Sequence, residues 1–199
     1  GAIPEKVLGM LNTGSPNQEA RACSLDEFLT HYDPSWVTWQ SPETGTTALL
    51  GAMSNKSPAD RAAIANLLLE SGADPAVGDH DGFTPLHSLL GSRNHDLSLD
   101  VPLLKRLIAG GADLNAVAKR VGTPLRAFLT NRNLLFPDSK PFLETLLSYS
   151  GIDILAVAAN GNSHLETARR MNISWRTELL EDYLRRAGID IPPPLEPAS

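Results

Sequence analysis

The chain has 199 residues, of which 42% are hydrophobic and 20% are charged, and these fractions suit one ordinary domain or a short repeat array. The formal net charge of -6 and the isoelectric point of about 5.3 argue against sequence-independent nucleic-acid binding, which needs a dense basic surface. The single cysteine, Cys23, excludes an intramolecular disulfide. No apolar run approaches the roughly 18 residues that would span a membrane.

The N-terminal segment is predicted to be helical over residues 2–12 and 16–31. Within it, Ser24-Leu25-Asp26-Glu27 has the pattern of a capping box, in which a serine and a glutamate three residues later satisfy the first backbone N–H groups of a helix. We therefore expect helical structure before the first of the repeated segments described below.

Four aromatic side chains follow within twelve residues: Phe28, Tyr32, Trp36 and Trp39. They have two interpretations. They either cover the open apolar end of the segment that follows, or they form an exposed aromatic anchor beside Glu43 for a partner.

From residue 45 onward, two short patterns recur in alternation. A glycine, a threonine or serine and a leucine recur in Gly45-Thr46-Thr47-Ala48-Leu49-Leu50, Gly82-Phe83-Thr84-Pro85-Leu86-His87, Gly122-Thr123-Pro124-Leu125-Arg126 and Gly161-Asn162-Ser163-His164-Leu165-Glu166. Between them lie turn patterns with glycine followed two places later by aspartate, as in Ser71-Gly72-Ala73-Asp74 and Gly110-Gly111-Ala112-Asp113. Such periodic self-similarity is typical of a repeat architecture.

Each repeat is predicted to be a helix, a turn, a second helix and an extended hairpin. The threonine or serine caps the first helix, as in Ser163-His164-Leu165-Glu166, and Ser57-Pro58 and Asp100-Val101-Pro102 are predicted to start second helices. Leu103-Leu104 with Leu107-Ile108 forms an apolar stripe, which Phe142-Leu143 with Leu146-Leu147 repeats. One repeat cannot bury this stripe alone, whereas stacked repeats can.

These residues resemble the ankyrin-repeat family. Thr84-Pro85-Leu86-His87 matches its Thr-Pro-Leu-His signature, and Gly111-Ala112-Asp113-Leu114-Asn115-Ala116 matches its turn. The resemblance implies an all-α ankyrin-repeat solenoid of helix-turn-helix repeats with short β-hairpin fingers. We expect a helical N-terminal cap over residues 1–44 and an array of about four repeats over residues 45–190. We expect a loose Pro-rich tail over residues 191–199.

The last repeat is expected to be a C-terminal cap. Its final helix, about Trp175 to Arg186, has many charged residues, and we place Arg176 among those on its outer, water-facing side.

The repeats are longer than the family's period of about 33 residues, because the anchors Thr47, Thr84, Thr123 and Ser163 are 37, 39 and 40 residues apart. The distance from each turn to the next anchor is constant at 11 residues. The extra residues must therefore lie between the two helices of each repeat, at 54–58, 91–100 and 131–141.

Metal binding or catalysis has weak support. Asp79-His80-Asp81 with His87 suggests a metal site, but the resemblance places His80 at a finger tip and gives His87 a structural hydrogen bond to Thr84. Cys23 has no activating partner in the sequence and is interpreted as a small packed side chain. We therefore predict no catalytic residue, no metal and no cofactor.

The resemblance implies that the chain binds another protein through the finger tips and the inner face of the first helices. Phe83 is expected to be an exposed anchor, and the third finger departs from the pattern because Val121 stands where glycine is expected and Gly122 comes one place late. Carried over residue by residue, the predicted partner-binding residues are Glu43, Thr46, His80, Asp81, Phe83, Ser92, Lys119, Arg120, Asn131 and Asn160.

We expect a non-enzymatic, monomeric interaction module that binds no nucleic acid and no membrane. No signal peptide is visible, so a cytoplasmic location is expected, with a secreted origin left open. One alternative is an acidic immunity or antitoxin protein that blocks a basic toxin. Another, from a different class, is an enzyme with an unrecognised site.

Overall fold

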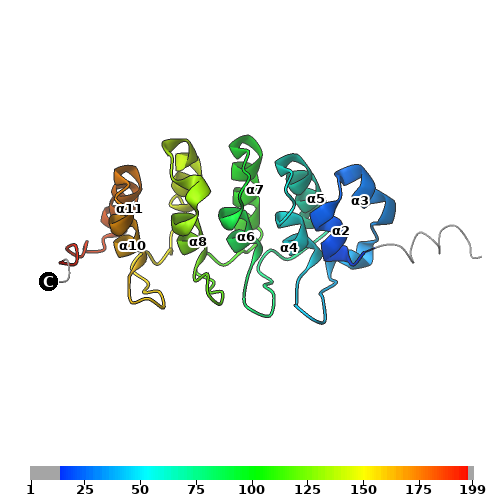
Figure 1. The fold of residues 1–199 in the computed structure, drawn as a ribbon, viewed down its shortest axis with the longest axis horizontal. Coiled ribbons are helices and arrows are strands. Elements are labelled where there is room, and N and C mark those ends of the chain that lie inside the picture. Colours follow the sequence, from blue (N-terminus) through cyan, green and yellow to red (C-terminus); the bar gives the residue numbers. More distant parts are fainter. Residues whose placement is uncertain (1–13, 197–199) are drawn as a thin grey trace, which may run out of the picture.

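The computed structural model describes residues 14–196, in which pairs of helices stack side by side in a single row (Figure 1). Residues 2–12, predicted to be helical, lie outside this range. The first helix of each repeat is short, and these helices are α4 (Ala48–Met53), α6 (Pro85–Gly91), α8 (Pro124–Thr130) and α10 (His164–Met171). The second helices are α5 (Pro58–Glu70), α7 (Leu97–Ala109), α9 (Lys140–Leu146) and α11 (Ser174–Ala187). The predicted all-α solenoid is confirmed.

The repeated threonine and serine residues begin the first helices. Thr47 accepts a hydrogen bond from the backbone N–H of Leu50 at 3.0 Å, and Thr123 and Ser163 accept equivalent bonds from Arg126 and Glu166. Each side chain thus satisfies one N–H group that has no partner inside the helix. The anchors recognised in the sequence are therefore helix caps.

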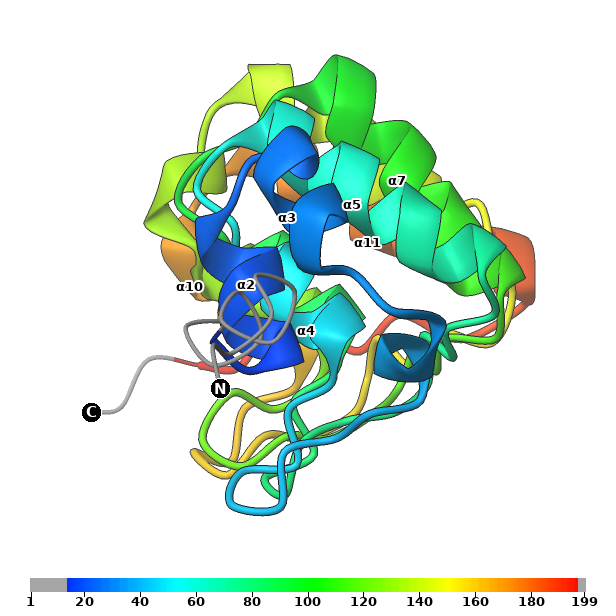
Figure 2. The same ribbon diagram turned by 90° about the vertical axis from the view of Figure 1, so that its right-hand side faces the viewer.

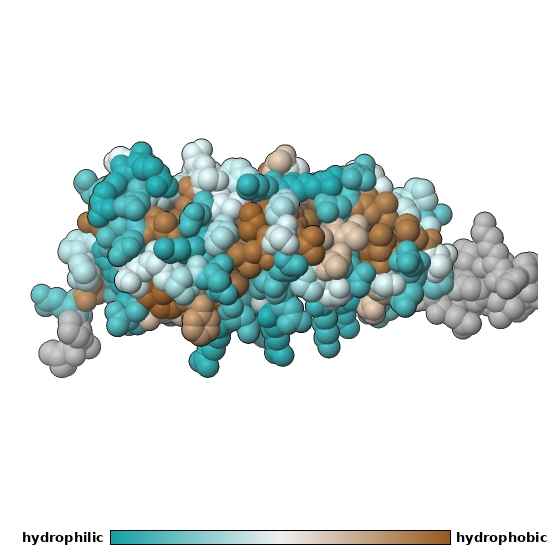
Figure 3. All heavy atoms as spheres, turned by 90° about the horizontal axis from the view of Figure 1, so that it is seen from above, coloured by the Kyte–Doolittle hydropathy of each residue, from teal (hydrophilic) through white to brown (hydrophobic). Residues whose placement is uncertain are grey.

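The apolar stripes lie between neighbouring repeats. Leu103, Leu104 and Leu107 of α7 are at most 1% exposed, and the stripe of Phe142, Leu143, Leu146 and Leu147 in the third repeat is at most 4% exposed. Viewed along the array, first helices and second helices form two layers with the core between them (Figure 2). Seen from above, hydrophobic residues reach the surface only in strips separated by hydrophilic ones (Figure 3).

The N-terminal segment forms α2 (Pro16–Ala22), α3 (Leu25–His31) and the 3₁₀ helix η1 (Pro34–Val37). The predicted helical stretch 16–31 is therefore two helices, because Ser24 interrupts it and accepts the N–H of Glu27 to start α3.

The aromatic cluster belongs mainly to this N-terminal segment's own packing. Phe28 is fully buried, and its ring centroid lies 5.4 Å from that of Tyr32 and 5.6 Å from that of Trp36. Tyr32 and Trp36 also pack against the core, whereas Trp39 is half-buried. The structure therefore favours the covering interpretation over an exposed anchor for Phe28, Tyr32 and Trp36.

The inserted residues lie between the two helices of each repeat, as predicted, but the second helix of repeat 2 begins earlier than expected. Asp96 caps α7 by accepting the N–H of Ser98 at 3.1 Å, so Pro102 lies inside the helix and Asp100 in its first turn. The predicted start at Asp100-Val101-Pro102 is wrong, because Asp100 is drawn into the core by an ion pair described below. In repeat 3 the insertion forms two 3₁₀ turns, η2 (Arg132–Leu134) and η3 (Pro137–Ser139).

The C-terminal helix α11 also differs from the prediction, at Arg176. Arg176 was placed on the outer face, but it is fully buried and donates to the carbonyl oxygens of Leu129, at 2.8 Å, and Leu134. Its guanidinium lies 4.9 Å from the centroid of the Phe128 ring, and burial lowers the pKa of Arg176 to about 10. Arg176 therefore anchors the insertion of repeat 3 instead of facing water.

The tail has no regular structure over residues 191–196, yet its start is attached. Ile191 packs against the core, and Arg169 donates to the carbonyl oxygen of Pro192 at 2.7 Å.

The fingers project from one side of the row as narrow loops (Figure 1). Isolated antiparallel bridges, not extended strands, close three of them: Gln40 with Thr47, Ala118 with Gly122, and Val157 with Ser163.

Candidate functional site

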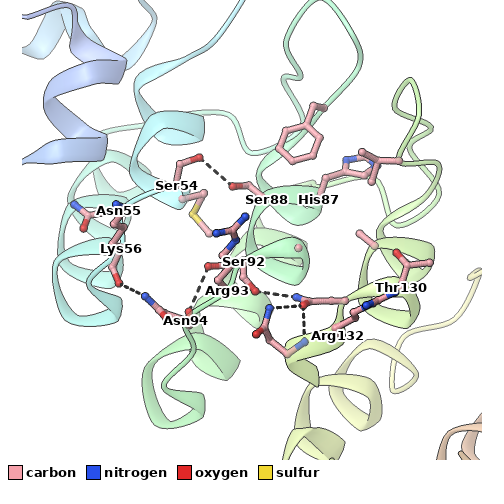
Figure 4. Close-up of a pocket in the computed structure, with 17 residues that line it drawn as sticks. Ser54, Asn55, Lys56, His87, Ser88, Ser92, Arg93, Asn94, Thr130 and Arg132 are labelled. Atoms are coloured by element: carbon pink, nitrogen blue, oxygen red, sulfur yellow. Dashed lines mark hydrogen bonds between the residues drawn. The ribbon is translucent and has the colours of Figure 1, made fainter. Parts of the chain in front are cut away.

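A groove of about 830 Å³ runs along the C-terminal ends of the first helices α4, α6 and α8. Its walls also include the loops that follow these helices, where the insertions begin. Figure 4 shows residues of three successive repeats around one hollow, from Lys56 on one side through Arg93 to Arg132 on the other. The groove thus collects side chains that are far apart in the sequence.

Phe83 lies at the base of the second finger and forms part of the groove wall. Its ring stacks on the imidazole of His87, with centroids 5.5 Å apart and planes inclined by 26°. Phe83 is therefore half-buried, and the prediction of an exposed tip residue is wrong. Its remaining exposed surface is apolar and borders both the groove and a smaller hollow beside α4.

His87 holds this part of the groove in place. Its Nδ1 lies 3.1 Å from the backbone nitrogen of Thr84 and 2.8 Å from the Thr84 hydroxyl, while Nε2 lies 2.7 Å from the carbonyl oxygen of Gly122. These contacts fit a neutral ring in which Nδ1 accepts and Nε2 donates. Burial lowers the pKa of His87, and the Gly122 hydrogen bond only partly opposes this. The predicted structural role is confirmed, and the hydrogen bond also joins repeat 2 to repeat 3.

The buried His87 and His164 and the half-buried His95 make stability depend on pH. Burial lowers the pKa of His87, His95 and His164, whereas in the unfolded chain each titrates near its ordinary pKa of about 6.5. The unfolded chain therefore binds more protons below about pH 6.5, so stability present above that pH is lost as the pH falls. The free energy of unfolding should drop by up to about 1.4 kcal/mol per pH unit for each histidine that stays neutral.

Melting temperatures measured between pH 7.5 and 5 test this expectation. His95→Gln keeps a donor for the carbonyl oxygen of Leu89 and should reduce the slope, whereas His80→Asn, at an exposed finger tip, should leave it unchanged. A melting temperature that stays constant down to pH 5 would contradict the argument.

Asn131 connects repeat 3 to repeat 2, and its counterpart Asn55 connects repeat 1 to the N-terminal segment. The Asn131 amide donates to the carbonyl oxygens of Leu90 and Ser92 at 2.9 and 2.8 Å, and the Asn55 amide donates likewise to Ala20 and Cys23. Asn131 is only 8% exposed. Its amide is therefore occupied in holding the loop backbone, although Asn131 also lines the groove.

The loop between α6 and α7 is held by an internal ion pair. Arg61 of α5 contacts both carboxylate oxygens of Asp100, at 2.8 and 3.3 Å, and both side chains are completely buried. The same guanidinium donates to the carbonyl oxygens of Asn55, at 3.0 Å, and Asn94, at 2.8 Å. Arg61 therefore holds the loops of the groove walls from the interior of the protein. The sequence analysis did not identify this ion pair, because its two residues are 39 positions apart.

The exposed charges of the groove are all positive. Lys56, Arg93 and Arg132 line it, and its lining contains no aspartate or glutamate. These three residues were also missed, although each lies nine residues after its anchor threonine. Their common distance from the anchor threonine is the sequence signal that identifies them.

The predicted finger-tip residues lie outside this groove. Glu43, His80, Asp81, Lys119, Arg120 and Asn160 are exposed, whereas Thr46 is half-buried in a smaller hollow between α2 and α4. Neighbouring tips contact each other through backbone hydrogen bonds, from the N–H of His80 to Thr44 and from that of Lys119 to Asp81, both at 2.9 Å. Of the predicted set, the groove brings together Phe83, Ser92 and Asn131.

The third finger has the irregular tip that its sequence suggested. Arg120 has a positive φ of 67° and Gly122 one of 81°, whereas in the other fingers the positive φ lies at the glycine two places before the anchor. Val121 occupies that place here, and a β-branched residue is poorly suited to positive φ. The turn therefore moves back by one residue, to Arg120.

Within residues 14–196, no group of three or more histidine, cysteine, aspartate or glutamate side chains could hold a metal ion. Cys23 donates to the carboxylate of Glu19 at 3.0 Å, and burial together with this carboxylate raises the pKa of its thiol to about 12. A thiol with so high a pKa is a poor nucleophile at neutral pH. No helix in this part of the chain is both long and apolar enough to cross a membrane.

Comparison with known proteins points to one family. The ankyrin repeat family model matches residues 81–119. A Rickettsia felis protein described as an ankyrin repeat protein is 38% identical over 71 residues, which make up 36% of this chain and 31% of that protein. The crystal structure of a functionally unknown protein from Leptotrichia buccalis C-1013-b is similar with a TM-score of 0.70 and 22% identity, over 89% of this chain and 96% of that one. This last likeness concerns the fold alone.

Proposed function

Because this chain belongs to the ankyrin-repeat family, whose members generally mediate protein–protein interaction, we propose that it binds a partner protein in the groove along α4, α6 and α8. The observation that carries the proposal is the combination of an aromatic wall at Phe83 with exposed polar and charged side chains around it. Apolar contacts near the centre of an interface supply most of the affinity, and polar groups at the rim supply selectivity.

The groove is held in place from several sides, which supports this assignment. Arg61, His87 and Asn131 each bind backbone carbonyl oxygens in the surrounding loops. A partner therefore would not have to order these loops, and binding is stronger when that entropy cost is already met.

The finger tips are a weaker candidate than the groove. Asp81 and Lys119 have opposite charges, but the Lys119 Nζ lies 3.9 Å from an Asp81 carboxylate oxygen, so the two partly neutralise each other. An acidic inhibitor of a basic toxin is also less favoured, because the exposed charges of the groove are positive.

Gly91 allows a direct test of the groove. It is the last residue of α6, it lines the groove, and a Cβ atom built on it meets nothing within 4 Å. Gly91→Trp should therefore fill the groove without disturbing the fold, and Thr130→Trp, at the exposed end of α8, should do the same from the next repeat.

The measurement is quantitative capture of proteins from a lysate of the source organism by the immobilised chain. A true partner should be retained by wild type and by Gly91→Ala and should be lost, by at least about tenfold, with either tryptophan variant. The finger-tip double variant His80→Ala/Asn160→Ala should still retain it. Equal capture by the wild-type chain and both tryptophan variants would overturn the proposal.

A further inference from the structure

One cationic side chain occupies the same position in each of the first three repeats. Lys56, Arg93 and Arg132 follow Thr47, Thr84 and Thr123 by nine residues, and in the fourth repeat this position is Asn172. Stacking of equivalent units places equivalent positions in a row along a solenoid. Figure 4 shows the three residues in this order across the groove. We name them the cation row.

The cation row is not neutralised within the described chain. All three side chains belong to exposed residues, and over residues 14–196 none of them forms an ion pair. The nearby carboxylates are engaged elsewhere: Asp100 is buried against Arg61, Asp96 caps α7, and Asp60, close to Lys56, accepts the backbone N–H of Leu25 at 3.2 Å. A chain with a net charge of -6 therefore presents a positive groove.

The groove also offers apolar surface beside these charges. Phe83, Val121 and Ala127 line it together with the cation row. Long basic side chains around an aromatic wall suit a segment that alternates carboxylates with apolar residues, because each arginine can bind a carboxylate with two parallel hydrogen bonds.

The spacing of the row restricts the conformation of that segment. Packed helices of neighbouring units lie about 8–10 Å apart. A polyproline II helix advances about 3.1 Å per residue with three residues per turn, so every third side chain lies on the same face, about 9 Å further on. In a β-strand, residues three apart point to opposite faces. The row therefore matches carboxylates at every third residue of a polyproline II segment.

We propose that the groove binds an acidic protein segment in polyproline II conformation, with aspartate or glutamate at positions i, i+3 and i+6 paired with the cation row. This inference rests on the proposed function, since it names the chemistry of the partner for the same groove. The residues between the carboxylates contact the apolar wall at Phe83.

Two labelled synthetic peptides of identical composition test the spacing. One has glutamate at every third position with prolines between, and its isomer has the three glutamates in succession. Fluorescence anisotropy should give the spaced peptide at least about tenfold tighter binding to the wild-type chain, because only its three carboxylates reach all three cations. Raising the salt concentration should reduce this difference.

Two triple variants with the same change in net charge distinguish binding by the cation row from a general effect of charge. Lys56→Glu/Arg93→Glu/Arg132→Glu should weaken binding of the spaced peptide by roughly thirtyfold, because three exposed ion pairs become repulsive contacts. The control variant Lys105→Glu/Lys119→Glu/Arg120→Glu changes the net charge equally, at exposed positions outside the groove, and should leave binding within about threefold.

The outcomes distinguish failure of the acidic-segment proposal from failure of the proposed function. Equal binding of the two peptides, or an equal loss in both triple variants, overturns the acidic-segment proposal. If neither peptide binds while Gly91→Trp still abolishes capture of a protein partner, the proposed function stands and the acidic segment is wrong. If Gly91→Trp leaves that capture unchanged, the proposed function itself fails.

Discussion

Asp100→Ala is expected to lower the free energy of unfolding by about 3–5 kcal/mol, the cost of leaving one member of a buried ion pair without its partner. Both side chains of the Arg61–Asp100 pair are completely inaccessible to solvent. Asp100 also accepts the backbone N–H of Asp96 at 2.9 Å, so the substitution removes a helix-start contact as well. Urea unfolding followed by circular dichroism measures the change.

Two further variants show what the pair does. Asp81→Ala removes an exposed carboxylate 3.9 Å from Lys119 and should change stability by less than about 0.5 kcal/mol. Arg61→Met/Asp100→Leu replaces the pair by apolar side chains, an exchange that is often neutral elsewhere. Here it should remain destabilising, because the carbonyl oxygen of Asn55 loses the Arg61 donor and the N–H of Asp96 loses the Asp100 acceptor. An Asp100→Ala cost below about 1 kcal/mol would contradict the central role given to this pair.

Gly51→Ala is expected to cost about 1–3 kcal/mol or more, although alanine is the better helix former. A Cβ atom on Gly51 would lie 2.3 Å from the backbone oxygen of Asn17 and 2.7 Å from its Cα. Because these neighbours are backbone atoms of α2, relief requires α2 to move away from α4. Thermal unfolding of the purified variant measures the loss.

Gly91→Ala is the matched control, because Gly91 is also a helical glycine in a first helix. Its Cβ would meet open space, so the substitution should be neutral or stabilise by up to about 1 kcal/mol through helix propensity. Similar melting temperatures for the two alanine variants would show that α2 does not pack as closely on α4 as described.

The sequence alone was sufficient to predict the repeats, their order and their core. Each helix cap is a contact between residues three positions apart, made by the anchors Thr47, Thr84, Thr123 and Ser163. The apolar stripes at Leu103 to Leu107 and Phe142 to Leu147 follow the period of a single helix. Such signals are local, so they can be recognised without knowing where the neighbouring repeat lies. The role of His87 was predictable for the same reason, since its partner Thr84 is in the same helical turn.

Only the tertiary structure decided which polar side chains face the groove and which hold its walls together. Asn131 and Arg176 have sequence contexts typical of exposed residues, yet they are buried because they satisfy carbonyl oxygens up to 47 residues away. Phe83 turns inward because the His87 ring offers it a stacking surface. The ends of short helices and the loops after them have no strong local preference, so their side-chain directions follow from contacts made when the repeats stack. These contacts form the groove at the ends of the first helices, whereas the sequence analysis placed most of its candidate residues on the finger tips.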